Sequence, residues 1–250
     1  MPSAALPVPS QASQHGSVSF FVVLFQGRSG SSWLIEALRS HHQIEAIGEK
    51  LAALHIGGAA AQNRWLESYF ADRPPDGSVL GFKTKLSDVI DVPGFASQLV
   101  HSKCAVIWLD RANLVKQAAS WLRANELYAQ RGVHNIRDFG DRLPPSRLDA
   151  AELLKRTVSL DQGRSQLGRF VEGLNLPTLR IRYEDLLEDP GRVFDSTQRF
   201  LRVEHCELTA SLVKATPDSL AAAISNLEEV EAALRGTGYL EMLYGSPDSR

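Results

Sequence analysis

The chain has 250 residues, of which 44% are apolar and 22% are charged, a composition typical of a globular protein and not of a disordered one. Its 27 Lys and Arg residues nearly balance 29 Asp and Glu residues, and the net charge of -2 excludes the general basic field that attracts nucleic acid. No apolar run approaches the roughly 20 residues that span a bilayer. We therefore expect a cytoplasmic protein that binds no nucleic acid and has no membrane span.

The ends of the chain differ in composition from its middle. The first 17 residues lack Lys, Arg and a long apolar run, so they predict a flexible tail and not a secretory signal. We predict a single domain over residues 18–244 and a frayed end over residues 245–250. The two cysteines predict no disulfide framework, and no Cys-x-x-Cys or His-Glu-x-x-His spacing supports a metal site.

The first predicted element is a buried strand over residues 18–25, because Val-Ser-Phe-Phe-Val-Val-Leu-Phe is apolar and rich in β-branched and aromatic residues. A glycine-containing loop follows at residues 27–32, with the sequence Gly-Arg-Ser-Gly-Ser-Ser. From Ser32 onward, apolar residues recur at helical spacing, and Ser31 or Ser32 is suited to cap the helix. The order is strand, loop, helix.

Strands and helices continue to alternate along the chain. Further strands are predicted over residues 79–83, 103–110 and 177–183. Helical patterns occupy residues 114–122, 153–171 and 210–234, whereas residues 128–146 form a predicted loop. This alternation predicts a P-loop-like, three-layer α/β/α fold with a mainly parallel central sheet.

The loop at residues 27–32 has the features of an anion site. Unpaired backbone N–H groups and the helix dipole favour a phosphate at a helix N-terminus, and Arg28 and the serine hydroxyls add further donors. The loop differs from the Walker A motif, since Gly27 and Gly30 are three residues apart and no Lys follows Gly30. An ordinary strand-to-helix turn is the alternative interpretation.

A second anion site is predicted where the strand over residues 103–110 ends. Arg111 follows this strand, and Lys116 and Ser120 lie on one polar face of the next helix together with Asn113. Arg111 and Ser120 are suited to clamp a phosphate, although a solvated helix face gives the same pattern. Two anion sites at the carboxyl ends of strands favour a ligand with two separated anionic groups.

With these motifs the sequence resembles the sulfotransferases that use 3′-phosphoadenosine 5′-phosphosulfate (PAPS). Residues 27–34 resemble the family's 5′-phosphosulfate loop in the Arg-Ser-Gly form of its carbohydrate and tyrosylprotein members. Arg111 and Ser120 are similar to the 3′-phosphate motif, and Tyr183 lies in a segment similar to one whose tyrosine contacts adenine, with a core tyrosine as the alternative. The resemblance implies a cofactor site made of Gly27, Arg28, Ser29, Gly30, Ser31, Ser32, Trp33, Arg111, Ser120 and Tyr183.

The resemblance also implies a reaction. PAPS is the donor, 3′-phosphoadenosine 5′-phosphate (PAP) the product, an acceptor hydroxyl the partner, and no metal is required. Arg28 would neutralise charge on the phosphate oxygens that leave, and a carboxylate or imidazole would take the hydroxyl proton. Glu49 resembles the catalytic base of tyrosylprotein sulfotransferases, and Lys83, with Lys85 facing the same side, resembles a lysine that assists the transfer. The other possible bases are His41, His42 and Glu36.

Two other functions remain compatible with the sequence. A kinase-like phosphotransferase would use ATP and Mg²⁺, with Asp110 as the metal ligand. The other alternative is a nucleotide-binding module that has the fold but does not catalyse a reaction. The acceptor, whether a glycan, a peptide tyrosine or a small molecule, is left open, as is the oligomeric state. Acceptor pockets in such folds come from variable loops, here predicted at residues 52–76 and 128–146.

Overall fold

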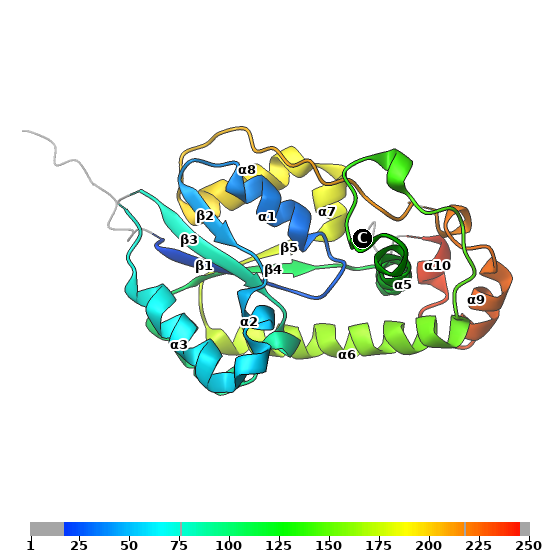
Figure 1. Ribbon diagram of the computed structural model, residues 1–250, viewed down its shortest axis with the longest axis horizontal. Helices are drawn as coiled ribbons and strands as arrows, with labels where there is room; N and C mark the ends of the chain where they lie inside the picture. Colours follow the sequence, from blue (N-terminus) through cyan, green and yellow to red (C-terminus); the bar gives the residue numbers. More distant parts are fainter. Residues whose placement is uncertain (1–17, 76, 218, 246–250) are drawn as a thin grey trace, which may run out of the picture.

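The computed structural model describes residues 18–75, 77–217 and 219–245. The predicted tail over residues 1–17 and residues 246–250 of the predicted frayed end lie outside this description. Five parallel strands form one central sheet, and helices cover both of its faces (Figure 1). The predicted three-layer α/β/α fold with a parallel sheet is therefore confirmed.

The strand order explains which loops meet. The strands are β1 (Phe20–Phe25), β2 (Ile44–Ile47), β3 (Val79–Thr84), β4 (Ala105–Asp110) and β5 (Thr178–Arg182), in the order β2-β3-β1-β4-β5. Every residue of β1 is buried, as expected for a central strand with helices on both faces. The chain leaves β1 toward β2 on one side and leaves β4 toward β5 on the other. The loops after β1 and β4 therefore border the topological switch point, where ligands bind in open α/β sheets.

Two apolar clusters hold the helices on the sheet. One face carries α1 (Ser31–Arg39), α7 (Tyr183–Glu188) and α8 (Pro190–Leu201). The other face carries α2 (Lys50–Ala53), α3 (Gly58–Ala71), α4 (Val92–His101) and α6 (Ala150–Leu174). Alternate residues of β1 point into each cluster, so that Phe21 packs toward α1 and Val22 toward α4.

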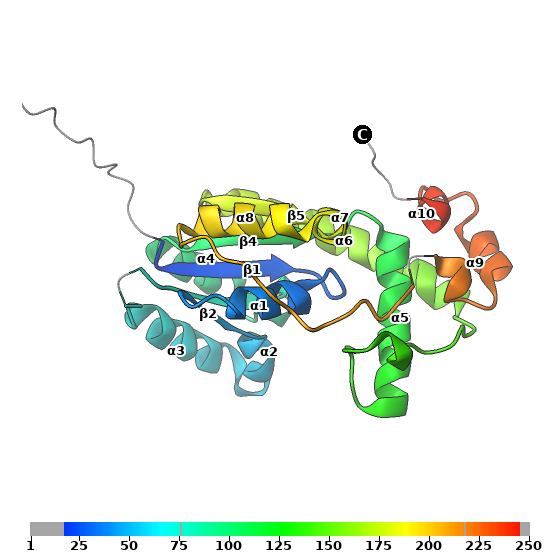
Figure 2. The same cartoon turned by 90° about the horizontal axis from the view of Figure 1, so that it is seen from above.

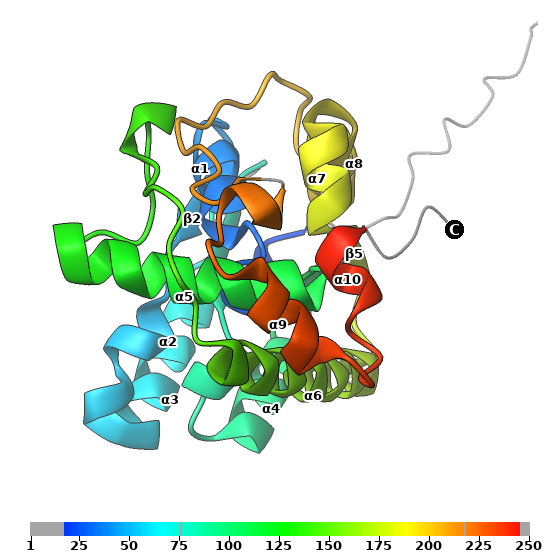
Figure 3. The same ribbon diagram turned by 90° about the vertical axis from the view of Figure 1, so that its right-hand side faces the viewer.

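A third apolar cluster lies beyond the carboxyl ends of the strands, where α5 (Leu114–Arg131) packs on α6, α9 (Leu227–Leu234) and α10 (Glu241–Tyr244) (Figures 2 and 3). Short 3-10 turns connect the larger elements at η1 (His55–Gly57), η2 (Leu86–Asp88), η3 (Phe139–Asp141) and η4 (Leu220–Ala222). In the part of the chain that the structure describes, no helix is both long enough and apolar enough to span a bilayer.

Several predicted elements differ from the structure. Residues 52–76 are not a loop for most of their length, because α3 occupies the middle of that segment. The helical pattern predicted over residues 210–234 is wrong before α9, because the described residues of 210–226 are largely irregular. The cap of α1 is Gly30, and neither Ser31 nor Ser32 caps that helix.

The contact between β1 and β3 supplies a test of the core. Gly81 lies opposite Phe21, and a Cβ atom at this glycine would lie 2.1 Å from the Phe21 ring. Gly81→Ala is therefore expected to lower the free energy of unfolding by about 1–3 kcal/mol through overpacking. Chemical denaturation measures the change. The control is Gly173→Ala near the end of α6, where nothing lies within 4 Å and the stability should be unchanged or up to about 1 kcal/mol higher.

Candidate functional site

The loop after β1 reverses the chain so that α1 begins directly above the end of the sheet. Gly30 has φ 84°, in the left-handed region that glycine adopts without strain, and a Cβ atom there would lie 2.7 Å from a ring carbon of Tyr183. Glycine therefore allows the tyrosine ring to pack against the loop. No side chain caps α1, which leaves its first N–H groups available to a ligand.

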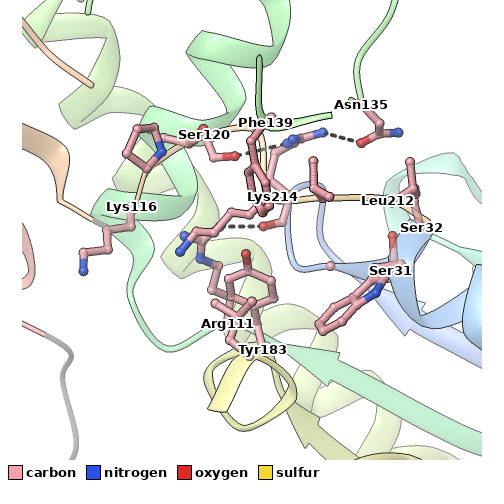
Figure 4. A pocket seen from close by; sticks show the side chains of 18 of the residues that line it. Ser31, Ser32, Arg111, Lys116, Ser120, Asn135, Phe139, Tyr183, Leu212 and Lys214 are labelled. Carbon is pink, nitrogen blue, oxygen red and sulfur yellow. Dashed lines mark hydrogen bonds between the residues drawn. The ribbon is translucent and has the colours of Figure 1, made fainter. Parts of the chain in front are cut away.

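A cavity of about 300 Å³ opens next to this loop (Figure 4). Among its lining residues are four cationic side chains and no carboxylate. The cations are Arg28, Arg111, Lys116 and Lys214. The hydroxyl of Thr216 also lines the cavity, buried and without a hydrogen-bond partner among the described residues. A cavity of this composition fits a polyanionic ligand.

Most residues of the predicted cofactor site share this cavity. Those that line it are Arg28, Gly30, Ser31, Ser32, Trp33, Arg111, Ser120 and Tyr183. Gly27 and Ser29 do not line it: the carbonyl of Gly27 accepts a hydrogen bond from Gln117, and the buried Ser29 hydroxyl donates to the carbonyl of Gln26. These hydrogen bonds stabilise the conformation of the loop on the side away from the cavity.

The two arginines of the site are close together. Arg28 Nε donates to Ser120 Oγ at 3.2 Å, and Arg111 Nη1 donates to the carbonyl of Arg28 at 2.8 Å. The Arg111 guanidinium also lies 4.4 Å from the centre of the Tyr183 ring. Burial, together with the charge of Arg111, lowers the pKa of Arg28. An anion bound here would relieve the repulsion between the two guanidinium groups.

A second charged cluster lies at the ends of β2 and β3. Lys83 Nζ is 2.9 Å from Ser32 Oγ and 3.3 Å from Glu49 Oε1, and Lys85 Nζ is 2.9 Å from Glu49 Oε2. Lys83 and Lys85 thus reach the same carboxylate, as their alternating positions predict. Burial opposes ionisation of Glu49, but the hydrogen bond from Lys85 and the charge of Lys83 outweigh it and hold the glutamate pKa below its ordinary value. Burial lowers the pKa of Lys83.

Two chain segments cover the cavity and are joined to each other. Ile136, from the loop after α5, forms an isolated bridge with Val213, and Arg28 Nη1 donates to the carbonyl of His134 and to Asn135 Oδ1. We call residues 132–138 and 210–217 together the lid. Residues 132–138 lie within the loop predicted over residues 128–146. The pairing of the two segments has no local signal in the sequence, because Ile136 and Val213 are more than 75 positions apart.

Glu36 anchors both segments of the lid and lies outside the Glu49 cluster. Its carboxylate accepts hydrogen bonds from Arg137 at 2.8 Å, from the Ser211 hydroxyl at 2.8 Å and from the Leu212 N–H at 3.1 Å. Burial acts to raise the pKa of Glu36. The hydrogen bonds from Ser211 and Leu212 and the charge of Arg137 outweigh this effect and lower the pKa. Glu36 does not line the cavity, and these contacts make it a structural anchor of the lid.

The predicted alternatives His41 and His42 follow the opposite end of α1 from Ser31, so they do not belong to the site. His41 Nδ1 accepts the Gln43 N–H at 2.9 Å, and its Nε2–H donates to the carbonyl of Glu204 at 2.6 Å. His41, His42 and Cys206 each bring a ligand-type atom within 4.8 Å of the others. Both ring nitrogens of His41 already form hydrogen bonds, however, so His41 has no free lone pair with which to bind a metal ion.

Asp110 is likewise committed to the fold. Its Oδ1 accepts the Arg111 N–H at 2.9 Å, and its Oδ2 pairs with the Arg180 guanidinium. Arg180 in turn stacks 4.3 Å from the Trp108 ring centre. Both carboxylate oxygens thus bind groups of the protein, which disfavours Asp110 as the Mg²⁺ ligand of the kinase alternative.

A scan against protein-family models and a search of curated proteins each find no match. Solved structures that are similar to this chain include a sulfotransferase from Alicyclobacillus acidocaldarius, with a TM-score of 0.49 and 16% identity over 87% of this chain and 91% of that chain. They also include the sulfotransferase domain from the curacin biosynthetic pathway, with a TM-score of 0.45 and 13% identity over 76% of each chain. Mouse sulfotransferase SULT7A1 complexed with PAP has a TM-score of 0.44 and 13% identity over 76% of this chain and 61% of that chain. The assignment of a function rests on the geometry of the site itself.

Removing the charge of Glu36 tests its role as the anchor of the lid. Glu36→Gln weakens the acceptor for three donors, so amide hydrogen exchange in residues 211–213 and 135–137 should accelerate by about 3- to 10-fold. Exchange in the core strands should be unchanged. The control is Glu67→Gln on the exposed side of α3, and unchanged exchange in the lid of Glu36→Gln would contradict the assignment.

Proposed function

We propose that this protein is a sulfotransferase that moves a sulfuryl group from PAPS to an acceptor hydroxyl without a metal ion. The observation that carries the proposal is a cavity with four cations and no carboxylate, next to a helix N-terminus and joined through Ser32 and Lys83 to the carboxylate of Glu49. Polyanion binding and a base within one connected cluster are the two requirements of sulfuryl transfer.

The two anionic ends of PAPS match two parts of the cavity. The 5′-phosphosulfate would lie on the loop at residues 27–32, against the N–H groups of α1 and the hydroxyls of Ser31 and Ser32. The 3′-phosphate would lie near Arg111 and Ser120. Trp33 and Tyr183 supply the aromatic surface for adenine. Arg28 lies between the two anion positions, since its backbone belongs to the loop and its guanidinium contacts Ser120.

In the proposed step, the bond between sulfur and the bridging oxygen of the 5′-phosphate breaks as a bond forms between sulfur and the acceptor oxygen. The hydroxyl proton passes to Glu49, and the electron pair of the broken bond stays on the phosphate, giving PAP. Lys83 would stabilise the sulfuryl oxygens, and its contacts with the Ser32 hydroxyl and with Glu49 support this role. Glu49 is ionised at neutral pH and can accept the proton, although the lowered pKa makes it a weaker base than an unpaired glutamate.

The remaining alternative is a nucleotide-binding module without catalysis. Such a module needs the loop and Arg111 but has no use for a buried lysine paired with a half-buried glutamate. Burying the Lys83 charge carries a desolvation cost, which the ion pair with Glu49 offsets only in part. Retention of this costly cluster beside the nucleotide cavity favours an enzyme.

The first experiment is calorimetric titration with PAP, adenosine 5′-phosphate and ATP, each with and without Mg²⁺. The proposal predicts that PAP binds most tightly and that Mg²⁺ has no effect. Arg111→Ala should weaken PAP by about 10- to 100-fold while changing adenosine 5′-phosphate far less, since only PAP carries the 3′-phosphate. Equal losses for both nucleotides would remove Arg111 from this role, and preference for ATP with Mg²⁺ would overturn the proposal.

The second experiment tests the base. Glu49→Gln keeps the shape of the side chain but cannot take a proton, so turnover of PAPS with an acceptor should fall by about 10²- to 10⁴-fold. PAP affinity should stay within about threefold of the wild type. The matched control is Glu45→Gln, an exposed glutamate on β2, which should keep full turnover. Normal turnover in Glu49→Gln would show that another group is the base.

A further inference from the structure

A second cavity, of about 520 Å³, lies on the other side of the loop, between the end of β1, the chain after β3 and one face of α6. This volume is within the range of roughly 300–1,000 Å³ that is usual for ligand sites. Gly27 and Lys85 line it, and Lys85 Nζ is 2.9 Å from Glu49 Oε2. Glu49 itself does not line the cavity, but through Lys85 the cavity adjoins the carboxylate to which we assign the role of base.

One face of α6 forms the wall opposite the loop. Arg156, Ser159, Gly163 and Gln166 recur at intervals of three and four residues, so their positions lie along one side of the helix. Because Gly163 has no side chain, the Gln26 side chain can pack against this wall. A Cβ atom at position 163 would lie 2.3 Å from Nε2 of Gln26. The glycine lets the Gln26 carboxamide extend between the loop and α6 at the edge of the cavity.

The charges in this cavity are unbalanced. Lys85 and Arg156 line it, and no carboxylate does. Lys85 is already paired with Glu49 and with Asp88, at 2.9 and 3.3 Å. Arg156 differs, since we find no hydrogen bond or ion pair for its guanidinium within residues 18–75, 77–217 and 219–245.

The guanidinium of Arg156 is held in place without being neutralised. It stacks on the Trp121 ring at 4.2 Å from the ring centre, and its Nε is buried without an acceptor. Burial lowers the pKa of Arg156, and the charge of Glu152, one turn away on α6, opposes this only in part. A fixed cation that lacks an acceptor at a cavity wall favours an anionic ligand.

The rest of the lining indicates the other properties of that ligand. Leu86, Val89 and Leu160 provide an apolar floor, whereas Ser87 and Gln162 are exposed at the rim. Together with Ser159 and Gln166, they present hydroxyls and carboxamides, the groups that bind hydroxyls of a hydrated ligand.

We propose that this cavity binds the acceptor, and that the acceptor is a polyhydroxylated anion such as a saccharide with a carboxylate group, which pairs with Arg156 while one hydroxyl lies against Glu49. This inference rests on the proposed sulfotransferase function and specifies its second substrate. The chemistry of the transfer is unchanged, and Arg156 acts only in binding the acceptor.

The test uses full-length protein saturated with PAP, so that a complex forms without turnover. It is titrated with hexuronate-containing oligosaccharides and with the same oligosaccharides after their carboxyl groups are reduced to alcohols. The acidic forms should bind about 10- to 100-fold more tightly than the reduced forms. In transfer assays with labelled PAPS, Arg156→Gln should raise the KM for the acidic acceptor by a similar factor and leave kcat within about threefold.

Matched variants separate charge from folding. Lys155→Gln removes the same charge from the neighbouring exposed position and should change neither KM nor kcat. Arg156→Lys keeps the charge and should retain part of the preference for the acidic forms. Unchanged PAP affinity in Arg156→Gln shows that the variant folds.

Each outcome has a definite meaning. Equal binding of acidic and reduced oligosaccharides, binding of neither, or tighter binding of a phenol such as 2-naphthol overturns the inference about the acceptor. If the wild type fails to bind PAP, the proposed function itself fails. If PAP binds with its dependence on the 3′-phosphate but no preference for acidic saccharides exists, only the assignment of the acceptor fails.

Discussion

The arrangement of the site depends on the buried ammonium of Lys83. A lysine charge at the end of a central strand is stable only when other groups replace its hydration, and here these groups come from two other parts of the chain. Glu49, after β2, supplies the opposite charge, and Ser31 and Ser32, at the start of α1, supply hydroxyl oxygens. The compensation of one charge thus fixes the loop after β1 relative to the ends of β2 and β3, and places a carboxylate near the cavity with four cationic side chains.

A second network joins the same loop to the lid. Arg28 takes a left-handed backbone conformation with φ 67°, which is costly for a residue with a side chain, and its guanidinium bridges Ser120 and the backbone of His134. Its pKa is lowered by burial and by Arg111, so Arg28 gains stabilisation from an incoming anion. The groups that hold the lid and the groups that would hold phosphate are therefore partly the same. Nucleotide binding and the position of the lid are expected to be coupled for this reason.

The sequence predicts those parts of the fold whose signals are local. The strands that became β1, β3, β4 and β5 are recognisable because they are apolar runs bounded by turns, and the loop at residues 27–32 because glycines and serines interrupt that pattern. The four-residue strand β2 is too short to show a period. The path of residues 210–217 depends on the hydrogen bond from Leu212 to Glu36 and on the bridge from Val213 to Ile136, and no local sequence pattern encodes these contacts. Glu49 was predicted by resemblance, whereas its two lysine partners become a cluster only once the sheet is formed.

The placement of the two cavities fits the geometry that the proposed reaction needs. Adjacent loop residues face different cavities, since Gly27 lines the one against α6 and Arg28 lines the one against Tyr183. In-line displacement requires the attacking and leaving oxygens on opposite sides of the sulfur. In the proposed arrangement the attacking oxygen would approach the sulfur from the cavity against α6, while the leaving oxygen stays on the phosphate that the loop would hold. Ser32 lines the first cavity and contacts Lys83, and Lys85 lines the second, so Glu49, which both lysines contact, connects the two cavities.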